Sequence, residues 1–406
     1  MKKRLAEIFC LFLLLIFAAN CDDIKLEEET ENSNAINLGE FKTYEEADIY
    51  KSKIDLQLWR DVKIEQADQA RFILLYGKFS TAFDAGKKAY ELFSNQLITN
   101  YKIVNNNNNI HDPFSNVLFL AKYQGRPSVY NYNLLKKQSK LLWSRWGRKV
   151  LSINHSSDRS TAFIITALGY GKQGSFPYVR DVRLYMYDTE KDKIDEIAEF
   201  GNGLQLYSYW ENKDTFKVNF TKPDSIQTEK IIQTIFAFDK SGSKKYSSTR
   251  EFLLTKDGFP KPPSRKFQMY SPAGTYKLRI TEDENEKSIY LRDQKKRAEV
   301  LIAEVDDEIK NLLWSPDEEY LFLILTRSNE KFSSKNELLI INTSEKTVKR
   351  VFKGPFYKNL LVQGNLLFFD QQYEGISQIT IYDFVTDVVF DEIRIAGGCG
   401  INDLTF

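Results

Sequence analysis

The sequence predicts two folded parts, a small α+β domain of order βαββαβ and a larger all-β domain built from repeated sheets. Three observations predict this organisation. A pattern of strand, glycine and helix occurs twice, thirty-eight residues apart, within residues 34–105. A run of five asparagines at 105–109 follows it and marks a linker over 105–112. Beyond this point, short aromatic and β-branched segments alternate with polar turns about every 8–12 residues.

The first residues have a pattern typical of an export signal. Three basic residues at 2–4 precede an apolar run over 5–19, which is shorter than the about 20 residues of a membrane-spanning helix. The run ends in Ala18-Ala19-Asn20-Cys21, which resembles a bacterial lipobox with Asn20 in place of glycine, alanine or serine. This resemblance implies that Cys21 is lipidated and anchors the chain to a bacterial membrane in the cell envelope. Ordinary signal-peptidase cleavage near the two alanines, or an uncleaved anchor, is the alternative.

Residues 1–20 are therefore expected to be a signal peptide and residues 21–33 a flexible acidic tether. The tether has too few apolar side chains to fold alone. Loss of the charges in the signal peptide changes the formal net charge from +1 to −1. A near-neutral exported chain is a poor nucleic-acid binder, because such binding depends on neutralising phosphates. Cys399 has no disulfide partner, since Cys10 lies in the signal peptide and Cys21 would be lipidated.

Residues 34–104 are expected to form the small domain. Each half contains an alternating strand, a Gly-x-Phe sequence and an amphipathic run with helical spacing. The two sequences are Gly39-Glu-Phe41 and Gly77-Lys-Phe79, and an alanine follows each phenylalanine after five residues (Ala47 and Ala85). Another alternating strand follows each helix, so two helices would cover one face of a single sheet.

Two copies of Gly-x-Phe-x5-Ala in this order resemble a SPOR (sporulation-related repeat) domain, a small module of bacterial envelopes. The resemblance implies that the sheet face opposite the helices binds peptidoglycan glycan strands that lack stem peptides. A generic ferredoxin-like α+β domain that packs against its neighbour is the alternative. The side chains expected on the open face are Asn37, Lys63, Glu65, Ile73, Leu75 and Lys102.

The remaining residues, 113–406, are expected to form one all-β domain without helices. Strand pairs, such as 320–325 with 337–342, recur at intervals of about 40–55 residues, which is in the range of β-propeller blades. Six blades fit this length, and five or seven lie within the error of the spacing. Loops would then form the binding surface around a central channel.

One turn carries a recognisable signature of such blades. Residues Leu313–Tyr320 resemble the W-S-P-D-G sequence of TolB-like and WD40-like propellers, with Glu318 in place of glycine. Residues 271–276 and 154–160 are fainter copies. The proline in this turn restricts φ, which gives the signature a structural role.

Catalytic chemistry has little support in the sequence. His111 and His155 are far apart and lack the carboxylate spacing of a metal site. Cys399 has no base nearby in sequence and is expected to be a buried, inert thiol. Neither a Gly-x-Ser-x-Gly elbow nor a phosphate loop occurs. We therefore expect no catalytic residues, no metal and no cofactor.

Residues 136–149 combine six basic side chains with Trp143 and Trp146. Aromatic and basic groups together can stack on sugars or bind an anionic polymer. The alternative is a blade hairpin that buries both tryptophans in the core and leaves the charges in water.

Together these patterns predict a non-enzymatic envelope lipoprotein. The small domain would bind peptidoglycan glycan, and the propeller would recruit an envelope protein whose effective concentration the two attachments raise. One alternative is a propeller-type polysaccharide hydrolase or lyase, which needs a carboxylate pair assembled by folding. Another is a surface-exposed adhesion lipoprotein.

Overall fold

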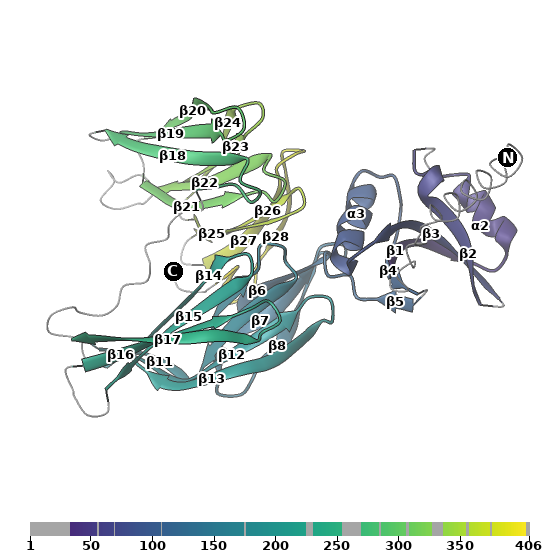
Figure 1. Cartoon of the computed structure of the whole chain (residues 1–406). Coiled ribbons are helices and arrows are strands. Elements are labelled where there is room, and N and C mark those ends of the chain that lie inside the picture. Colours follow the sequence, from purple (N-terminus) through teal and green to yellow (C-terminus); the bar gives the residue numbers. More distant parts are fainter. Residues whose placement is uncertain are drawn as a thin grey trace, which may run out of the picture. The chain divides into compact units, whose positions relative to one another are not determined.

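The chain divides into two units, Met1–Ile110 and His111–Phe406 (Figure 1). Residues 1–32, with the expected signal peptide, Cys21 and nearly all of the tether, lie outside the described residues. Within the described part, no helix has both the length and the apolar character needed to cross a membrane. The computed structural model describes residues 33–54, 57–68, 70–106, 108–173, 176–224, 230–253, 269–283, 286–305, 308–326, 336–354, 357–373 and 376–402.

The first unit has the expected βαββαβ order, with one additional strand. All neighbouring strands in its sheet are antiparallel, in the order β2-β3-β1-β4-β5. A short 3₁₀ helix, Trp59–Asp61, precedes β2. The elements are β1 (Asn34–Phe41), α2 (Tyr44–Lys51), β2 (Val62–Asp68), β3 (Arg71–Phe79), α3 (Ala82–Ser94), β4 (Lys102–Asn105) and β5 (Asn108–Ile110).

The additional strand corrects the expected linker at 105–112. Its residues pair with β4, opposing Ile110 to Ile103 and Asn109 to Val104. Asparagine side chains add nothing to an apolar core, but their backbone groups can still extend a sheet edge. Composition alone therefore placed the end of the small unit too early.

The repeated Gly-x-Phe sequence has a packing reason. In each copy the phenylalanine ring lies directly against the glycine two residues earlier. A Cβ atom on Gly39 would lie 2.8 Å from Cζ of Phe41, and one on Gly77 would lie 2.7 Å from Cε2 of Phe79. Gly77 also has a φ of +68°, in the left-handed region that favours glycine. The repeat thus preserves a close ring-on-backbone contact before each helix.

The two helices begin in the same way and cover one face of the sheet. Thr43 and Thr81 cap them, because each hydroxyl accepts a hydrogen bond from the amide three residues later, at 3.2 and 3.0 Å. Alternate strand residues point towards the helices. The core between sheet and helices contains side chains from both repeats, including Ile36, Leu74, Ala85, Ala89, Leu92 and Ile103.

The second unit is a β-propeller. Its described residues form six antiparallel sheets and no helix. Strand β29, near the end of the chain, pairs with β6 near the start of the unit, opposing Cys399 to Ala121. This pairing joins the last sheet to the first, since β29 also lies beside β27 of the last sheet.

The six sheets follow one another along the chain. The first contains β6 (Asn116–Tyr123), β7 (Arg126–Asn133), β8 (Gln138–Trp143) and β29 (Cys399–Gly400). The second contains β9 (Lys149–His155), β10 (Thr161–Ala167), β11 (Gly169–Gln173), β12 (Phe176–Asp188) and β13 (Lys193–Gly203). The third contains β14 (Gln205–Asn212), β15 (Thr215–Pro223), β16 (Lys230–Phe238) and β17 (Lys244–Leu253). The fourth contains β18 (Tyr276–Asp283), β19 (Glu286–Asp293) and β20 (Ala298–Val305). The fifth contains β21 (Glu308–Trp314), β22 (Tyr320–Thr326), β23 (Asn336–Asn342) and β24 (Thr347–Gly354). The sixth contains β25 (Tyr357–Gln363), β26 (Leu366–Tyr373), β27 (Ile376–Asp383) and β28 (Val388–Ile393).

The signature turn at 315–319 and its two fainter copies have one geometry. In each, the backbone amide of a serine donates to the carbonyl five residues later, at 2.9–3.0 Å. The serine hydroxyl accepts from the amide of that same later residue, at 2.9–3.1 Å. The third residue after each serine has a φ of 64°, 77° or 65°. The serines are Ser156, Ser271 and Ser315, and the residues of positive φ are Arg159, Gly274 and Glu318.

Neighbouring sheets of the propeller pack through apolar side chains. Between the second and third sheets, the rings of Phe163 and Phe216 stack with centroids 4.4 Å apart. Both rings are fully buried, in a cluster that also includes Phe200, Phe220 and Phe238. Face-to-face packing of this kind leaves the loops at the ends of the strands available for binding.

Candidate functional site

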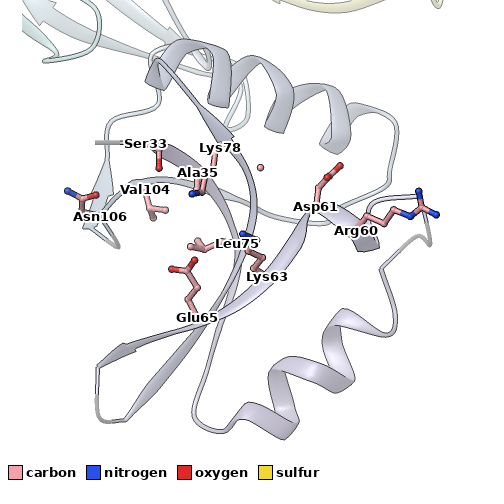
Figure 2. A pocket seen from close by; sticks show the side chains of 11 residues that line it. Ser33, Ala35, Arg60, Asp61, Lys63, Glu65, Leu75, Lys78, Val104 and Asn106 are labelled. Atoms are coloured by element: carbon pink, nitrogen blue, oxygen red, sulfur yellow. The ribbon is translucent and has the colours of Figure 1, made fainter. Parts of the chain in front are cut away.

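The sheet face opposite the helices of the small unit contains a cavity of about 500 Å³ (Figure 2). It follows from the alternation of side chains along a strand. Ile36 and Leu74 point into the helix-side core, so their neighbours Ala35 and Leu75 point the other way. The lining residues are Ser33, Ala35, Arg60, Asp61, Lys63, Glu65, Leu75, Gly77, Lys78, Val104 and Asn106.

The cavity combines an apolar floor with a charged rim. Ala35, Leu75 and Val104 belong to a small buried cluster on this face. Lys63 and Glu65 lie on β2, and both side chains are exposed beside that floor. A flat apolar floor with hydrogen-bonding groups at its edge can bind a ligand that has both a CH face and hydroxyl groups.

The structure brings three of the six expected glycan residues to this cavity, namely Lys63, Glu65 and Leu75. Ile73 lies in the same apolar cluster and is buried. Asn37 is also buried, and its Oδ1 accepts a hydrogen bond from the amide of Gly39 at 2.9 Å. Asn37 therefore supports the irregular pairing of β1 with β3 near Gly39.

Lys102 does not line the cavity and instead forms an ion pair with Glu40. Its Nζ lies 2.7 Å from Oε1 of Glu40, which Arg71 also approaches at 3.7 Å. The hydrogen bond from Lys102, helped by the charges of both basic groups, lowers the pKa of Glu40. Glycan binding by the six residues stays a prediction. The 3₁₀ helix residues Arg60 and Asp61 enter the lining without any sequence signal that places them there.

The basic segment 136–149 of the propeller separates its two tryptophans. Trp143 ends β8 and is half-buried against Tyr185, with ring centroids 5.1 Å apart. Trp146 is 86% exposed, and the guanidinium of Arg126 lies 4.1 Å from its ring centroid. The alternative in which both tryptophans lie in the core is therefore wrong for Trp146, because the chain leaves the sheet after Trp143.

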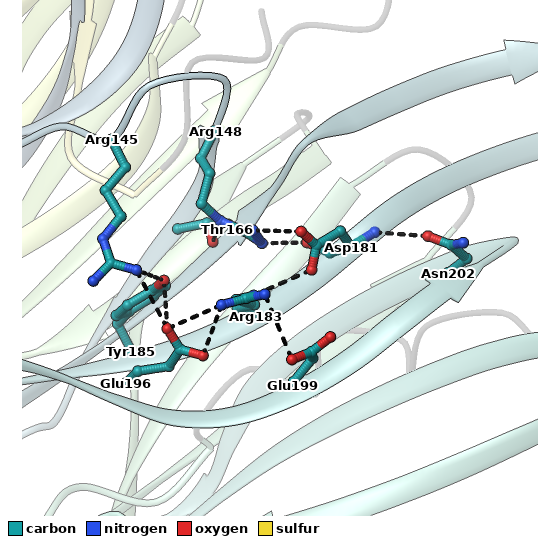
Figure 3. Close-up of polar contacts among 9 residues, drawn as sticks. All are labelled: Arg145, Arg148, Thr166, Asp181, Arg183, Tyr185, Glu196, Glu199 and Asn202. Atoms are coloured by element: carbon teal, nitrogen blue, oxygen red, sulfur yellow. Dashed lines mark hydrogen bonds and ion pairs between the residues drawn. The ribbon is translucent and has the colours of Figure 1, made fainter.

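Two arginines on either side of Trp146 join a polar network on β12 and β13 (Figure 3). Arg145 donates to the hydroxyl of Tyr185 at 2.9 Å and lies 3.4 Å from Glu196. Arg148 is buried and forms an ion pair with Asp181 at 3.0 Å. Figure 3 shows Arg183 between these two carboxylates, with contacts of 3.1 Å to each.

The network lowers the pKa of Glu196. Burial raises the pKa of Glu196, but the hydrogen bond from Tyr185 and the charges of Arg183 and Arg145 outweigh burial and lower it. The contact with Asp181 raises the pKa of Arg183. Because every carboxylate named here has a basic partner, the network has a structural role in holding the loop between β8 and β9.

The histidines and the cysteine do not assemble a reactive site. His155 is half-buried with its Nε2 atom inaccessible to solvent, and loss of solvent together with the charge of Arg159 holds its pKa well below the usual 6.5. Cys399 is buried, and burial raises the pKa of its thiol to about 12. Within the described part of the chain, no group of three His, Cys, Asp or Glu side chains could hold a metal ion.

The chain resembles several solved structures at 9–13% sequence identity. No protein-family model matches the chain, and no curated protein matches it. A structure of TolB from Acinetobacter baumannii is 12% identical over 84% of this chain and 81% of its own, with a TM-score of 0.43. An oligogalacturonate lyase from Vibrio parahaemolyticus is 13% identical over 66% of this chain and 86% of its own, with a TM-score of 0.32. A chain from a nidogen–laminin complex is 9% identical over 71% of this chain and 98% of its own, with a TM-score of 0.36. Likeness at this level carries no argument about activity or partners.

Proposed function

We propose that this protein is a non-enzymatic envelope lipoprotein that binds peptidoglycan glycan through its small unit and a protein partner through its propeller. In this proposal Cys21 carries the lipid, the small unit is a SPOR-like module, and the six sheets of the second unit are the blades of a six-bladed propeller. The two attachments hold the propeller near the cell wall and raise the effective concentration of its partner.

The cavity on the open sheet face carries the wall-binding proposal. Its floor of Ala35, Leu75 and Val104 is apolar, as the CH face of a sugar ring requires. Lys63 and Glu65 supply a donor and an acceptor beside it for sugar hydroxyls. The volume of about 500 Å³ is in the range of ligand sites in proteins.

Sedimentation with purified peptidoglycan sacculi tests this role. The chain from residue 22 onward, with no lipid, is incubated with sacculi before and after an amidase removes the stem peptides. We expect it to pellet with sacculi, and more strongly after amidase treatment. Replacing both Lys63 and Glu65 with alanine should weaken binding about tenfold, the effect of losing about 1.4 kcal/mol of polar contacts, without changing the net charge.

The matched control is Lys87→Ala, which removes an exposed lysine from α3 on the covered side of the sheet. This variant should pellet like the unchanged protein. If the unchanged protein stays in the supernatant with treated sacculi, or if Lys87→Ala loses as much binding as the double variant, the wall-binding role is rejected.

A further inference from the structure

We propose that the turn Arg145–Arg148 presents Trp146 as the anchor of a docking surface for an acidic, aromatic-containing segment of a protein partner. This inference rests on the proposed partner-binding role of the propeller. It specifies the surface that binds the partner and the kind of segment that the partner presents. It places the surface at the loop ends of the first two sheets of the propeller.

Four large apolar side chains with unusual exposure lie at these loop ends. Trp146 is 86% exposed, and Tyr123, Leu168 and Tyr170 are each about 40% exposed. Strand pairing and a cation–π contact join two of them. Tyr123 is opposite Arg126 at the end of the β6–β7 hairpin, and Arg126 stacks on Trp146.

The same surface continues onto the second sheet. A Cβ atom on Gly147 would lie 3.6 Å from Cδ2 of Leu168, so the turn that carries Trp146 lies close to the residue that follows β10. Next along the chain, Tyr170 has the ammonium of Lys149 5.3 Å from its ring centroid. The aromatic and basic groups therefore form one continuous surface across two sheets.

The turn is held in a fixed geometry. The amide of Arg148 donates to the carbonyl of Arg145 at 3.1 Å, and Gly147 between them has a φ of +73°. Arg145 and Arg148 both reach into the network on β12 and β13 (Figure 3). A tryptophan on a turn fastened at both ends loses little conformational entropy on binding, which is the property of a preorganised anchor.

The charge of the surface selects an acidic partner. Arg126 and Lys149 lie beside exposed aromatic rings, and Arg180 lies against Gly169, the residue before Tyr170. Among the described residues, none of these three basic groups has a carboxylate within ion-pair distance. The nearby carboxylates Asp181 and Glu196 are already bound by other arginines. Unneutralised positive charge steers a negatively charged partner to the surface.

The aromatic groups favour a protein segment as the acidic partner. Tryptophan, tyrosine and arginine are the side chains that most often dominate protein–protein binding energy. Arg126 covers one face of the Trp146 ring, so the other face is available to an aromatic or apolar side chain of the partner. Acidic residues flanking such a side chain would meet Arg126 and Lys149.

Fluorescence anisotropy with a defined acidic polymer tests the inference. The probe is a fluorescein-labelled random copolymer of glutamate and tyrosine, and the protein is the whole chain from residue 22 onward. We expect Trp146→Ala to weaken binding tenfold or more, because hot-spot truncations have effects of at least this size. Trp146→Phe should keep most of the affinity, and Arg126→Glu should weaken binding to a similar extent as Trp146→Ala.

The matched control is Tyr246→Ala. Tyr246 is 46% exposed on β17, and the Lys217 ammonium lies 5.7 Å from its ring centroid, so it has the same kind of contact outside the surface. This variant should bind like the unchanged protein. Because both replaced rings are exposed, neither change removes core packing.

Three results would overturn the inference. One is equal binding of Trp146→Ala and the unchanged protein. Another is that the unchanged protein binds a lysine–tyrosine copolymer as tightly as it binds the glutamate–tyrosine copolymer. A third is Trp146-dependent binding to phosphatidylglycerol vesicles without binding to the glutamate–tyrosine copolymer, which would indicate a membrane contact. Sacculus sedimentation of Trp146→Ala should be unchanged, so failure of wall binding and failure of the docking surface give different results.

Discussion

Glu318 has a backbone conformation that glycine adopts more easily, yet we expect Glu318→Gly to destabilise the propeller. Its φ is 65°, in the left-handed region. Its Oε1 accepts a hydrogen bond at 2.5 Å from the amide of Ala273, which lies in the equivalent turn before the preceding sheet. Burial raises the pKa of Glu318, but hydrogen bonds from Ser271, Thr275 and Ala273 outweigh burial and lower it. The carboxylate is therefore charged and joins two turns.

Two opposing effects decide the size of the change. Glycine relieves about 1–2 kcal/mol of left-handed strain in the folded state. It also increases the conformational entropy of the unfolded chain, which lowers the free energy of unfolding by about 0.4–1 kcal/mol. The lost hydrogen bonds to a charged group are worth about 1.5–3 kcal/mol, and the amide of Ala273 loses its acceptor. The loss is larger, so Glu318→Gly should be about 1–2 kcal/mol less stable, and its Tm about 2–4 °C lower.

Arg159 provides the opposite case at the same position of an equivalent turn. Its φ is 64°, and its Nη1 is buried with no hydrogen-bond partner among the described residues. Burial lowers the pKa of its guanidinium to about 9. Arg159→Gly relieves both the strain and the desolvation of the charge, so this variant should be at least as stable as the unchanged protein.

Urea unfolding followed by near-ultraviolet circular dichroism measures these differences. Glu318→Gln, which keeps an acceptor oxygen without the charge, should fall between glycine and glutamate. A Glu318→Gly variant as stable as the unchanged protein would refute the reasoning, because strain would then outweigh the inter-turn hydrogen bonds. A loss in Arg159→Gly as large as that in Glu318→Gly would refute it as well.

Two further predictions concern the half-buried His155 and the repeated glycine. Since the pKa of His155 is lower in the folded protein than the unfolded value of 6.5, the unfolded chain binds more protons below that pH, and stability should fall as the pH drops below about 6.5. His155→Asn should reduce the pH dependence of the unfolding free energy, measured by urea unfolding at pH 5.5 to 8, by up to about 1.4 kcal/mol per pH unit. An unchanged pH dependence in this variant would contradict the prediction. Gly77→Ala should lose at least about 2 kcal/mol, because its Cβ would lie 2.7 Å from the Phe79 ring and its φ is +68°. Gly39→Ala, whose Cβ would meet a similar ring without the positive φ, should lose less stability when both variants are measured by urea unfolding. The reverse order would contradict the strain argument.

Much of the fold could be read from short stretches of sequence. The Gly-x-Phe repeats and the serine turn at 315–319 depend on contacts within about five residues. The residues that make such contacts are neighbours in the sequence, so their patterns predicted the βαββαβ order and the repeated sheets. The same holds for the faint turn at 156–160, whose hydrogen bonds match those of the clearer copy.

The candidate site could be predicted only in part. Alternation along the strands placed Lys63, Glu65 and Leu75 on the open face, since the period of a strand is known from sequence. This alternation could not show that the Asn37 side chain accepts a hydrogen bond from the amide of Gly39, or that Lys102 forms an ion pair with Glu40. Those contacts depend on the register between strands that are distant in sequence.

The sequence by itself determined the local elements, and tertiary structure decided which side chains meet. Trp143 and Trp146 are three residues apart and equally apolar, yet one packs on Tyr185 and the other is exposed beside Arg126. The difference depends on where β8 ends and on which sheet the next strand joins. The pairing of β29 with β6 could not be predicted from the sequence either, because the paired residues lie near opposite ends of the unit along the chain. Long-range pairing is chosen by the total packing of the chain, which no short stretch of sequence contains.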